Sequence, residues 1–243
     1  MSDLMRASRW ASAWSSAISY SSKAGWAADI ASGGICWSVV AESLRVLIVV
    51  TLTLRLSLAG HHGAASIIDL CGDVPSVLGM AEPAGRGIRD WLSSPDRDAQ
   101  ELFTMRVSAT SRLHVIPAGS ATSFDENSLA DLMSTAHSHP VVIDFGLIQP
   151  PASAQGVTHA DWLVVRPCYL ALRRAARLHS RPRGVVLLKE SGRALTARDV
   201  QSVVGSPVVA EITVADGVAR SVDAGLLATR LPKQLAEELT VLL

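Results

Sequence analysis

The sequence predicts an α/β fold with a doubly wound, mostly parallel sheet and helices on both faces. Two observations lead to this prediction. From residue 65 onward, short runs rich in Val, Ile and Leu recur along the chain, and segments with helical spacing lie between them. The runs are continuously apolar rather than alternating, which is typical of strands buried on both faces of a parallel sheet. Strands that alternate with helices form βαβ units, which build a layered α/β domain.

The composition supports a folded globular protein. The chain has 243 residues, 49% of them hydrophobic, with 22 basic and 22 acidic side chains. General disorder is excluded, because it requires low hydrophobicity and high net charge. Zero net charge argues against a nucleic-acid module built on a global basic excess. The three cysteines lie far apart without a C-x-x-C motif, so neither a disulfide framework nor a zinc knuckle is indicated and we expect a cytoplasmic protein.

The N-terminal quarter differs from the rest of the chain. Residues 1–35 are dominated by Ser and Ala, and we expect a poorly ordered tail there and a single α/β domain over 36–243. The uncharged run Val46–Leu54 is much shorter than the ~20 apolar residues of a spanning helix, so we interpret it as a buried core segment. A membrane-associated protein that uses this run together with Trp10 and Trp14 stays open as an alternative.

Six strands are expected, each bounded by turn residues or by a helical segment. They span Ala65–Asp69, Leu113–Pro117, Val141–Gly146, Trp162–Arg166, Gly184–Lys189 and Pro207–Thr213.

Helices are expected between these strands, with recognisable start signals. Ser123 and Glu126 have the spacing of a capping box that opens a helix over 126–137. Thr196 and Asp199 form a similar signal before 200–204, and a final helix follows Pro232.

One helix is expected after Pro167, in the segment CYLALRRAARLHS. Its spacing predicts two faces. Inward positions are Tyr169, Leu172, Ala176 and Leu178, and solvent positions are Arg173, Arg174 and Arg177.

Two acidic residues stand at the carboxyl ends of predicted strands, where ligands bind in such sheets. Asp69 closes the first of the six strands, and Asp144 lies in the run VVIDFG. A buried carboxylate is costly unless it is paired or near a metal, and aspartates in this position hold water on Mg²⁺ in phosphate chemistry. The alternative, that Asp144 caps a helix or pairs with an arginine, stays open.

Three motifs follow one another between Ile67 and the C-terminus: IIDLCGDVPSVLG, LHVIPAG and VVIDFG. In this order they resemble the MinD/ParA group of deviant P-loop ATPases, the bacterial positioning and partitioning proteins. The first is similar to the family's second strand and acidic switch segment, the second to the next strand, and the third to Walker B with Asp144 in the acidic place. The resemblance implies a P-loop NTPase fold with ATP and Mg²⁺ as cofactors. It places Ser43, Asp69, Asp144 and Pro167 at the nucleotide, with Asp144 binding Mg²⁺ through water.

The sequence departs from this family at its defining motif. No K-G-G-x-G-K-[ST] loop is present, only Ser43 offers a match near residues 35–51, and no lysine occurs between Lys23 and Lys189. The second acidic residue of the switch segment falls on Cys71. Because losing one cationic group in phosphoryl transfer costs ~10³-fold or more, we expect a non-hydrolysing scaffold or regulator of chromosome partitioning, septum placement or pilus localisation. A working ATPase with an unusual phosphate loop is the alternative.

The resemblance also implies partners: a homodimer and a protein partner in a positioning system, in the cytoplasm or peripherally at the membrane or nucleoid. The sharpest charged surface is the arginine cluster Arg173, Arg174, Arg177, Arg181 and Arg183. It is either a solvated helix face or a contact with DNA, a membrane surface or a partner protein.

Overall fold

The computed structural model describes the backbone of residues 33–38, then residues 64–136, 140–152 and 160–213, and near the C-terminus 217, 220–221, 224–227 and 233–238. Ser43, Val46–Leu54, Pro232 and, apart from residues 33–35, the predicted tail lie outside the described residues.

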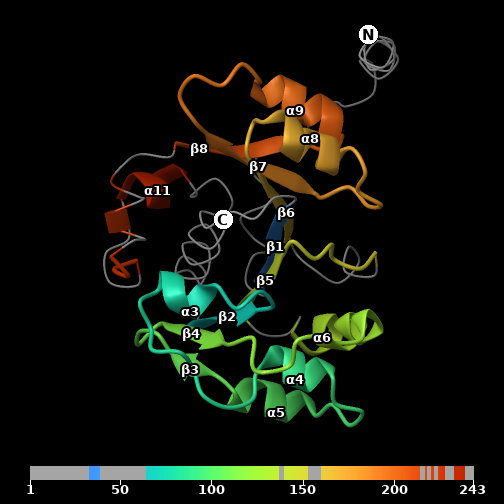
Figure 1. The fold of residues 1–243 in the computed structure, drawn as a ribbon, viewed down its shortest axis with the longest axis vertical. Helices are drawn as coiled ribbons and strands as arrows, with labels where there is room; N and C mark the ends of the chain where they lie inside the picture. The colour runs from blue at the N-terminus through green and yellow to red at the C-terminus, as the bar shows by residue number, and fades with distance from the viewer. Residues whose placement is uncertain are drawn as a thin grey trace.

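The described strands form one eight-stranded sheet (Figure 1). Its order is β3-β4-β2-β5-β1-β6-β7-β8, and every neighbouring pair is parallel except β3 with β4. The doubly wound, mostly parallel sheet predicted from the sequence is therefore confirmed. The strands are β1 (Gly33–Ser38), β2 (Ala65–Asp69), β3 (Val107–Ser108), β4 (Leu113–Ile116), β5 (Val141–Gly146), β6 (Ala160–Val165), β7 (Gly184–Lys189) and β8 (Val208–Thr213).

The helices lie on both sides of this sheet. They are α3 (Val74–Val77), α4 (Ile88–Leu92), α5 (Ala99–Thr104), the 3₁₀ turn η2 (Glu126–Ser128), α6 (Leu129–Ala136), α8 (Tyr169–Ala175), α9 (Ala197–Val204) and α11 (Lys233–Glu238). Within the described part of the chain, none of them is long and apolar enough to cross a membrane.

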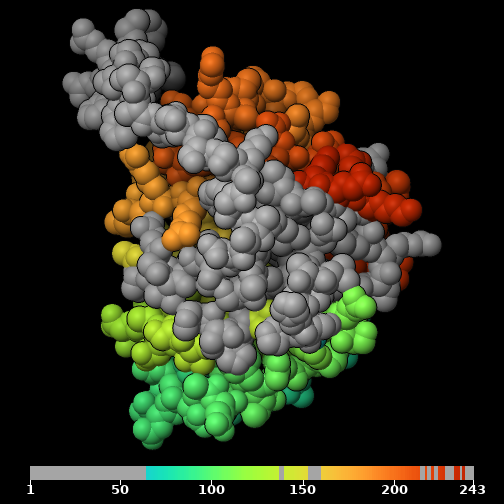
Figure 2. Space-filling view, turned by 180° about the vertical axis from the view of Figure 1, so that it is seen from behind, coloured from blue at the N-terminus to red at the C-terminus, as the bar shows by residue number. Residues whose placement is uncertain are grey.

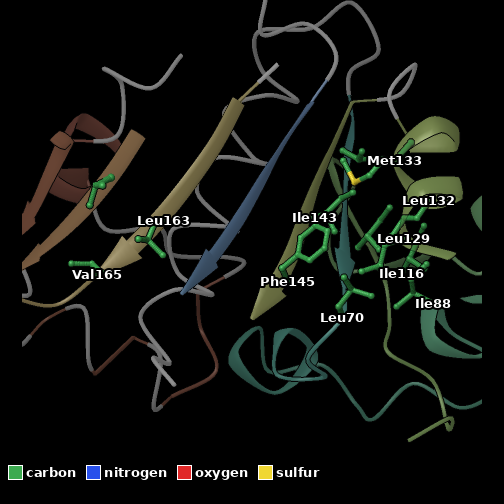
Figure 3. Close-up of a cluster of buried hydrophobic side chains, with 14 of the residues drawn as sticks. Leu70, Ile88, Ile116, Leu129, Leu132, Met133, Ile143, Phe145, Leu163 and Val165 are labelled. Carbon is green, nitrogen blue, oxygen red and sulfur yellow. The ribbon is translucent and has the colours of Figure 1, made fainter. Parts of the chain in front are cut away.

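Two hydrophobic clusters cover the two faces of the sheet. One cluster joins alternate strand residues such as Ile67 and Val142 to α3 and α11. The other joins the opposite strand residues to α4, α5, α6, α8 and α9. Figure 3 shows Ile143 and Phe145 directed from β5 toward Leu129 of α6. Burial on both faces explains why these strands read as continuous apolar runs.

The structure confirms one predicted helix start and corrects another. Thr196 accepts a hydrogen bond from the Asp199 amide and Asp199 bonds back to Thr196, which is the predicted capping box of α9. The predicted box of Ser123 with Glu126 is wrong. Asp125 caps this element instead, because its carboxylate accepts the Asn127 amide at 3.0 Å.

The predicted inward face of α8 is also partly wrong. The buried residues are Ala171, Leu172 and Ala175, whereas Tyr169 is 75% exposed and Ala176 is exposed. At about 100° per residue, Tyr169 and Ala176 lie on the flank of the stripe that these three residues form. Small alanines therefore face the sheet, and the aromatic ring stays outside.

The solvent positions predicted for α8 are confirmed. Arg173 and Arg174 on the helix and Arg177 just after it are all exposed.

Candidate functional site

The centre of the candidate site is a pair of aspartates at the carboxyl edge of the sheet. Asp69 ends β2, and its register partner on the adjacent strand β5 is Asp144. Both residues are fully buried. Because side chains alternate along a strand, Asp69 follows Ile67 and Asp144 follows Val142 on the face that carries α3 and α11. The structure thus brings together two of the four predicted nucleotide-site residues.

Asp69 organises the turn that follows its own strand. Its Oδ1 accepts the amides of Cys71 and Gly72 at 3.0 and 2.8 Å, and its Oδ2 accepts the amide of Val74 at 3.0 Å. Burial raises the pKa of Asp69 to about 6, and the negative charge of Asp144 acts in the same direction, against the three amides. Asp69 therefore keeps its proton to a higher pH than an ordinary aspartate does.

Asp144 bonds to the turn after β5. Its Oδ1 accepts the amide of Gly146 at 2.9 Å, and its carbonyl oxygen accepts the amide of Leu70 at 3.0 Å. The second bond continues the ladder between the two strands past Asp69. Backbone hydrogen bonds between β2 and β5 therefore continue up to the edge where both carboxylates lie.

Arg89, from α4, holds the loop after β2 in place. Its Nε and Nη2 donate to the carbonyl oxygen of Leu70 at 2.9 and 2.7 Å, and Nη2 also donates to that of Cys71 at 2.9 Å. The segment that carries Cys71 in place of a second acidic residue is thus held by the Asp69 carboxylate, which accepts its amides, and by the Arg89 guanidinium, which binds its carbonyl groups. The role of Arg89 has no signal in the sequence, because its partners lie 18 and 19 residues away and no local spacing indicates them.

Asp90, the next residue of α4, fixes the loop after β4. Its carboxylate accepts the amides of Gly87 at 2.8 Å and of Ser120 and Ala121 at 3.0 Å, together with the Ser120 hydroxyl at 2.9 Å. Burial acts to raise the pKa of Asp90, but these hydrogen bonds outweigh it and hold the pKa below its ordinary value.

Two glycines permit this attachment. A Cβ on Gly87 would lie 2.2 Å from the carbonyl oxygen of Pro117 and 2.3 Å from the amide nitrogen of Gly119. Gly119 has a φ of +83°, and a Cβ there would lie 1.9 Å from Oδ2 of Asp90. The start of α4 can approach the β4 loop this closely only because both residues lack a side chain.

Pro167, the third predicted nucleotide-site residue, lies on the other side of β1. It is buried just after β6, which pairs with β1 on the side opposite β5. Its neighbour Arg166 forms an ion pair with Glu190 after β7, and Glu190 also accepts Nε of Arg193 at 2.7 Å. Burial acts to raise the pKa of Glu190, but the hydrogen bond from Arg193 and the charge of Arg166 lower it. No motif in the sequence predicts this charged cluster, because Arg166 and Glu190 lie 24 positions apart.

The donor set at Asp69 and Asp144 fits Mg²⁺, which is usually bound by one or two carboxylates, water and substrate phosphates. No group of three or more potential metal-binding side chains exists among the described residues. A resident ion with an all-protein shell is therefore not indicated in this part of the chain. Ser43, the fourth predicted residue of the nucleotide site, lies outside the described residues.

Comparison with known proteins identifies the fold. No protein-family model and no curated protein sequence matches the chain. Solved structures do match, each over most of its length.

The chain is similar to a ParA family ATPase from Chlorobium tepidum TLS, at 18% identity and a TM-score of 0.66, over 86% of this chain and 96% of the other. It is similar to the septum site-determining protein MinD complexed with Mg-ADP from Pyrococcus horikoshii OT3, at 14% identity and a TM-score of 0.60, over 86% and 96%. It is similar to a MinC:MinD cell division protein complex from Aquifex aeolicus, at 13% identity and a TM-score of 0.59, over 79% and 85%.

Proposed function

We propose that this chain, which has the fold of the ParA and MinD ATPases, is a scaffold or regulator of a bacterial positioning system and does not hydrolyse ATP. The observation that carries the proposal is the absence of any lysine between Lys23 and Lys189. This interval contains β1 and the segment after it, where ATPases of this fold carry their phosphate loop. Phosphoryl transfer depends on positioned cations, and losing one costs ~10³-fold or more.

The loop after β2 supports the same proposal. Cys71 stands where the family has its second acidic residue, and Arg89 binds the carbonyl oxygen of Cys71. A thiol in this place supplies no carboxylate to orient an attacking water. The neighbouring Asp69 carboxylate already accepts three backbone amides, so its hydrogen bonds serve the turn.

The aspartate pair favours a second candidate function, Mg-nucleotide binding. Under this proposal Asp144 holds Mg²⁺ through water with Asp69 beside it, while Ser43 lies at the phosphates and Pro167 at the base. A divalent cation would supply charge neutralisation for the phosphates and would relieve the repulsion that contributes to the raised pKa of Asp69. The active ATPase stays the alternative to the non-hydrolysing scaffold.

Calorimetric titration with ATP and ADP in the presence of Mg²⁺, followed by a phosphate-release assay, separates these functions. We expect no phosphate release above the buffer rate from the wild-type chain. If nucleotide binds, Asp144→Asn should abolish the heat of binding, and Asp96→Asn, an exposed matched control, should not. The non-hydrolysing scaffold would be contradicted if the wild-type chain and Asp96→Asn released phosphate and Asp144→Asn did not.

The partners in this proposal are a second copy of the chain and a further protein of the positioning system. The MinC:MinD complex is a precedent on the same fold for a bound partner protein. We propose a cytoplasmic location with peripheral attachment at the membrane or nucleoid.

A further inference from the structure

The strand β8 forms one edge of the sheet. Among the described strands it has a neighbour on one side only, β7, and the opposite edge of the sheet is formed by β3. An edge strand presents a row of backbone N–H and C=O groups that can pair with a strand of another chain. The strand β3 has only two residues, whereas β8 has six. The edge at β8 is therefore the longer one and the one that needs protection from unwanted pairing.

The amide of Val208, the first residue of β8, is directed away from β7. The carbonyl oxygen of Pro207 accepts the amide of Val185 on β7 at 2.8 Å. In a trans peptide the carbonyl group and the following N–H point in opposite directions, so the N–H of Val208 points to the outer side of the strand. There it donates to Oε1 of Gln201, a side chain of α9, at 2.8 Å.

The amide of Thr213, the last residue of β8, is bonded in the same way from another helix. It donates to Oε2 of Glu238 in α11 at 3.1 Å. An amide directed at β7 would meet a carbonyl group of that strand, so this bond indicates that the N–H of Thr213 also points outward. Gln234, one turn earlier in α11, donates to Oε1 of Glu238 at 3.0 Å and orients the carboxylate.

The two acceptors reach the edge from opposite faces of the sheet. The helix α9 buries Val200 and Val204 in one hydrophobic cluster, and α11 buries Leu235 in the other. Both helices contact β8 (Figure 1), and in Figure 2 the orange surface of α9 and β8 adjoins the red surface that contains α11. We call Gln201 and Glu238 the edge acceptors, because they bind the first and the last amide of the edge strand.

We infer that the edge acceptors prevent β8 from pairing with β8 of a second copy of this chain. A two-fold symmetric contact places the same edge of both copies together, and antiparallel pairing of two β8 strands would use their outward amides. In each copy the terminal outward amides are already bonded within the chain. A second copy therefore gains no hydrogen bond at these two places without breaking one.

This inference is independent of the function proposed above. The aspartate pair lies on β2 and β5, and β1, β6 and β7 separate these strands from β8. A failure of the nucleotide experiments would leave the edge acceptors unaffected, and the reverse also holds.

Analytical ultracentrifugation of the full-length chain tests the inference. Gln201→Ala with Glu238→Ala removes both edge acceptors and frees both amides. This variant should form larger species than the wild-type chain does, with an association constant for this step at least about tenfold higher. Self-association equal to that of wild type would overturn the inference.

Two controls separate the loss of the acceptors from other effects. Gln201→Glu with Glu238→Gln exchanges the two side chains, so the composition and net charge are unchanged and an acceptor oxygen stays at each place. Gln100→Ala with Glu237→Ala removes the same groups from exposed positions in α5 and α11. Both controls should associate within about twofold of wild type. Association of either control as strong as that of the alanine variant would overturn the inference.

Hydrogen exchange identifies the surface that associates. In Gln201→Ala with Glu238→Ala, the amides of residues 208–213 should exchange more slowly as the protein concentration rises, and those of β3 should not. Association without this protection of β8 would overturn the inference. Alanine favours helix, so circular dichroism should show a folded variant. If it does not, the single variants Gln201→Ala and Glu238→Ala each free one amide, and association of both no stronger than that of the exchanged control would overturn the inference.

Discussion

Asp69 and Asp144 are register partners on adjacent parallel strands, and both carboxyl groups are fully buried at the same edge of the sheet. Two like charges in this arrangement disfavour each other's ionisation, because water does not screen the repulsion between buried groups. The raised pKa of Asp69 records this cost, with burial as its larger cause and the charge of Asp144 as its smaller one. The protonation state of Asp69 at the end of β2 therefore depends on the charge of Asp144 on β5.

Removing the charge of Asp144 should lower the pKa of Asp69. In Asp144→Asn the charge repulsion disappears while burial and the three amide hydrogen bonds persist, so the pKa of Asp69 should fall from about 6. A carbon-detected NMR titration of the Asp69 carboxyl measures this change. Asp96→Asn, at an exposed position, should leave the titration as it is. An unchanged pKa in Asp144→Asn would show that the two carboxylates do not interact.

The raised pKa of Asp69 also predicts a pH dependence of stability. Between pH 3.8 and about 6 the folded state holds a proton that the unfolded state has released, so the contribution of Asp69 to stability falls as the pH rises through this window. The shift corresponds to about 3 kcal/mol. From pH 4 to 7, the unfolding free energy of wild type minus that of Asp69→Asn should therefore decrease by roughly 2 kcal/mol, less than the full shift because the unfolded carboxyl is already more than half ionised at pH 4. Urea denaturation at each pH measures it, and a constant difference would refute the prediction.

Losing the Asp90 carboxylate should destabilise the attachment of α4 to the β4 loop. Asp90→Ala leaves three amides and one hydroxyl without their acceptor, which should cost about 2–4 kcal/mol of unfolding free energy. Chemical denaturation measures the loss. Asp96→Ala, an exposed aspartate close by in the sequence, should change the stability by less than about 0.5 kcal/mol. Equal effects of the two substitutions would show that the hydrogen bonds of Asp90 contribute nothing specific.

Two glycines with similar backbone conformations should respond very differently to alanine. Gly119 and Gly192 have φ angles of +83° and +77°, so both substitutions carry the left-handed penalty of about 1–2 kcal/mol. Only Gly119 has close neighbours, with Oδ2 of Asp90 at 1.9 Å from an added Cβ, whereas nothing lies within 4 Å at Gly192. Gly119→Ala should therefore cost at least about 2 kcal/mol more than Gly192→Ala in thermal or urea unfolding. A similar cost at both positions would contradict the close approach of the two loops.

Local features of the sequence were sufficient to predict the sheet and part of the site. Strands buried on both faces leave a continuous apolar run, which is why Val141–Gly146 and Gly184–Lys189 were predicted with their observed bounds. Because parallel strands share one carboxyl edge, Asp69 and Asp144 could also be expected to meet there.

Features that depend on distant partners or on exposed residues were missed. Asp90 bonds to residues about 30 positions away, and Arg89 to carbonyl groups 18 and 19 positions away, so no local spacing signals either interaction. The strand β3 has two exposed residues and no apolar run. The hydrophobic character of Tyr169 predicted a buried side chain, but the buried face of α8 consists of Ala171, Leu172 and Ala175 instead.

The central position of β1 in the sheet has a consequence for folding during synthesis on the ribosome. β1 is the first described strand to be synthesised, yet its two neighbours are β5 and β6, with Gly33 opposite Val141 and Gly34 opposite Ala160. At roughly 5–20 residues per second, the first neighbour emerges roughly 5–20 s after β1. Until then both edges of β1 lack their native partners, and a nascent chain that stops short of residue 160 leaves one edge open. The sheet is completed from its middle only late in translation, so chaperone binding during this interval should be strongest on chains arrested between β1 and β6.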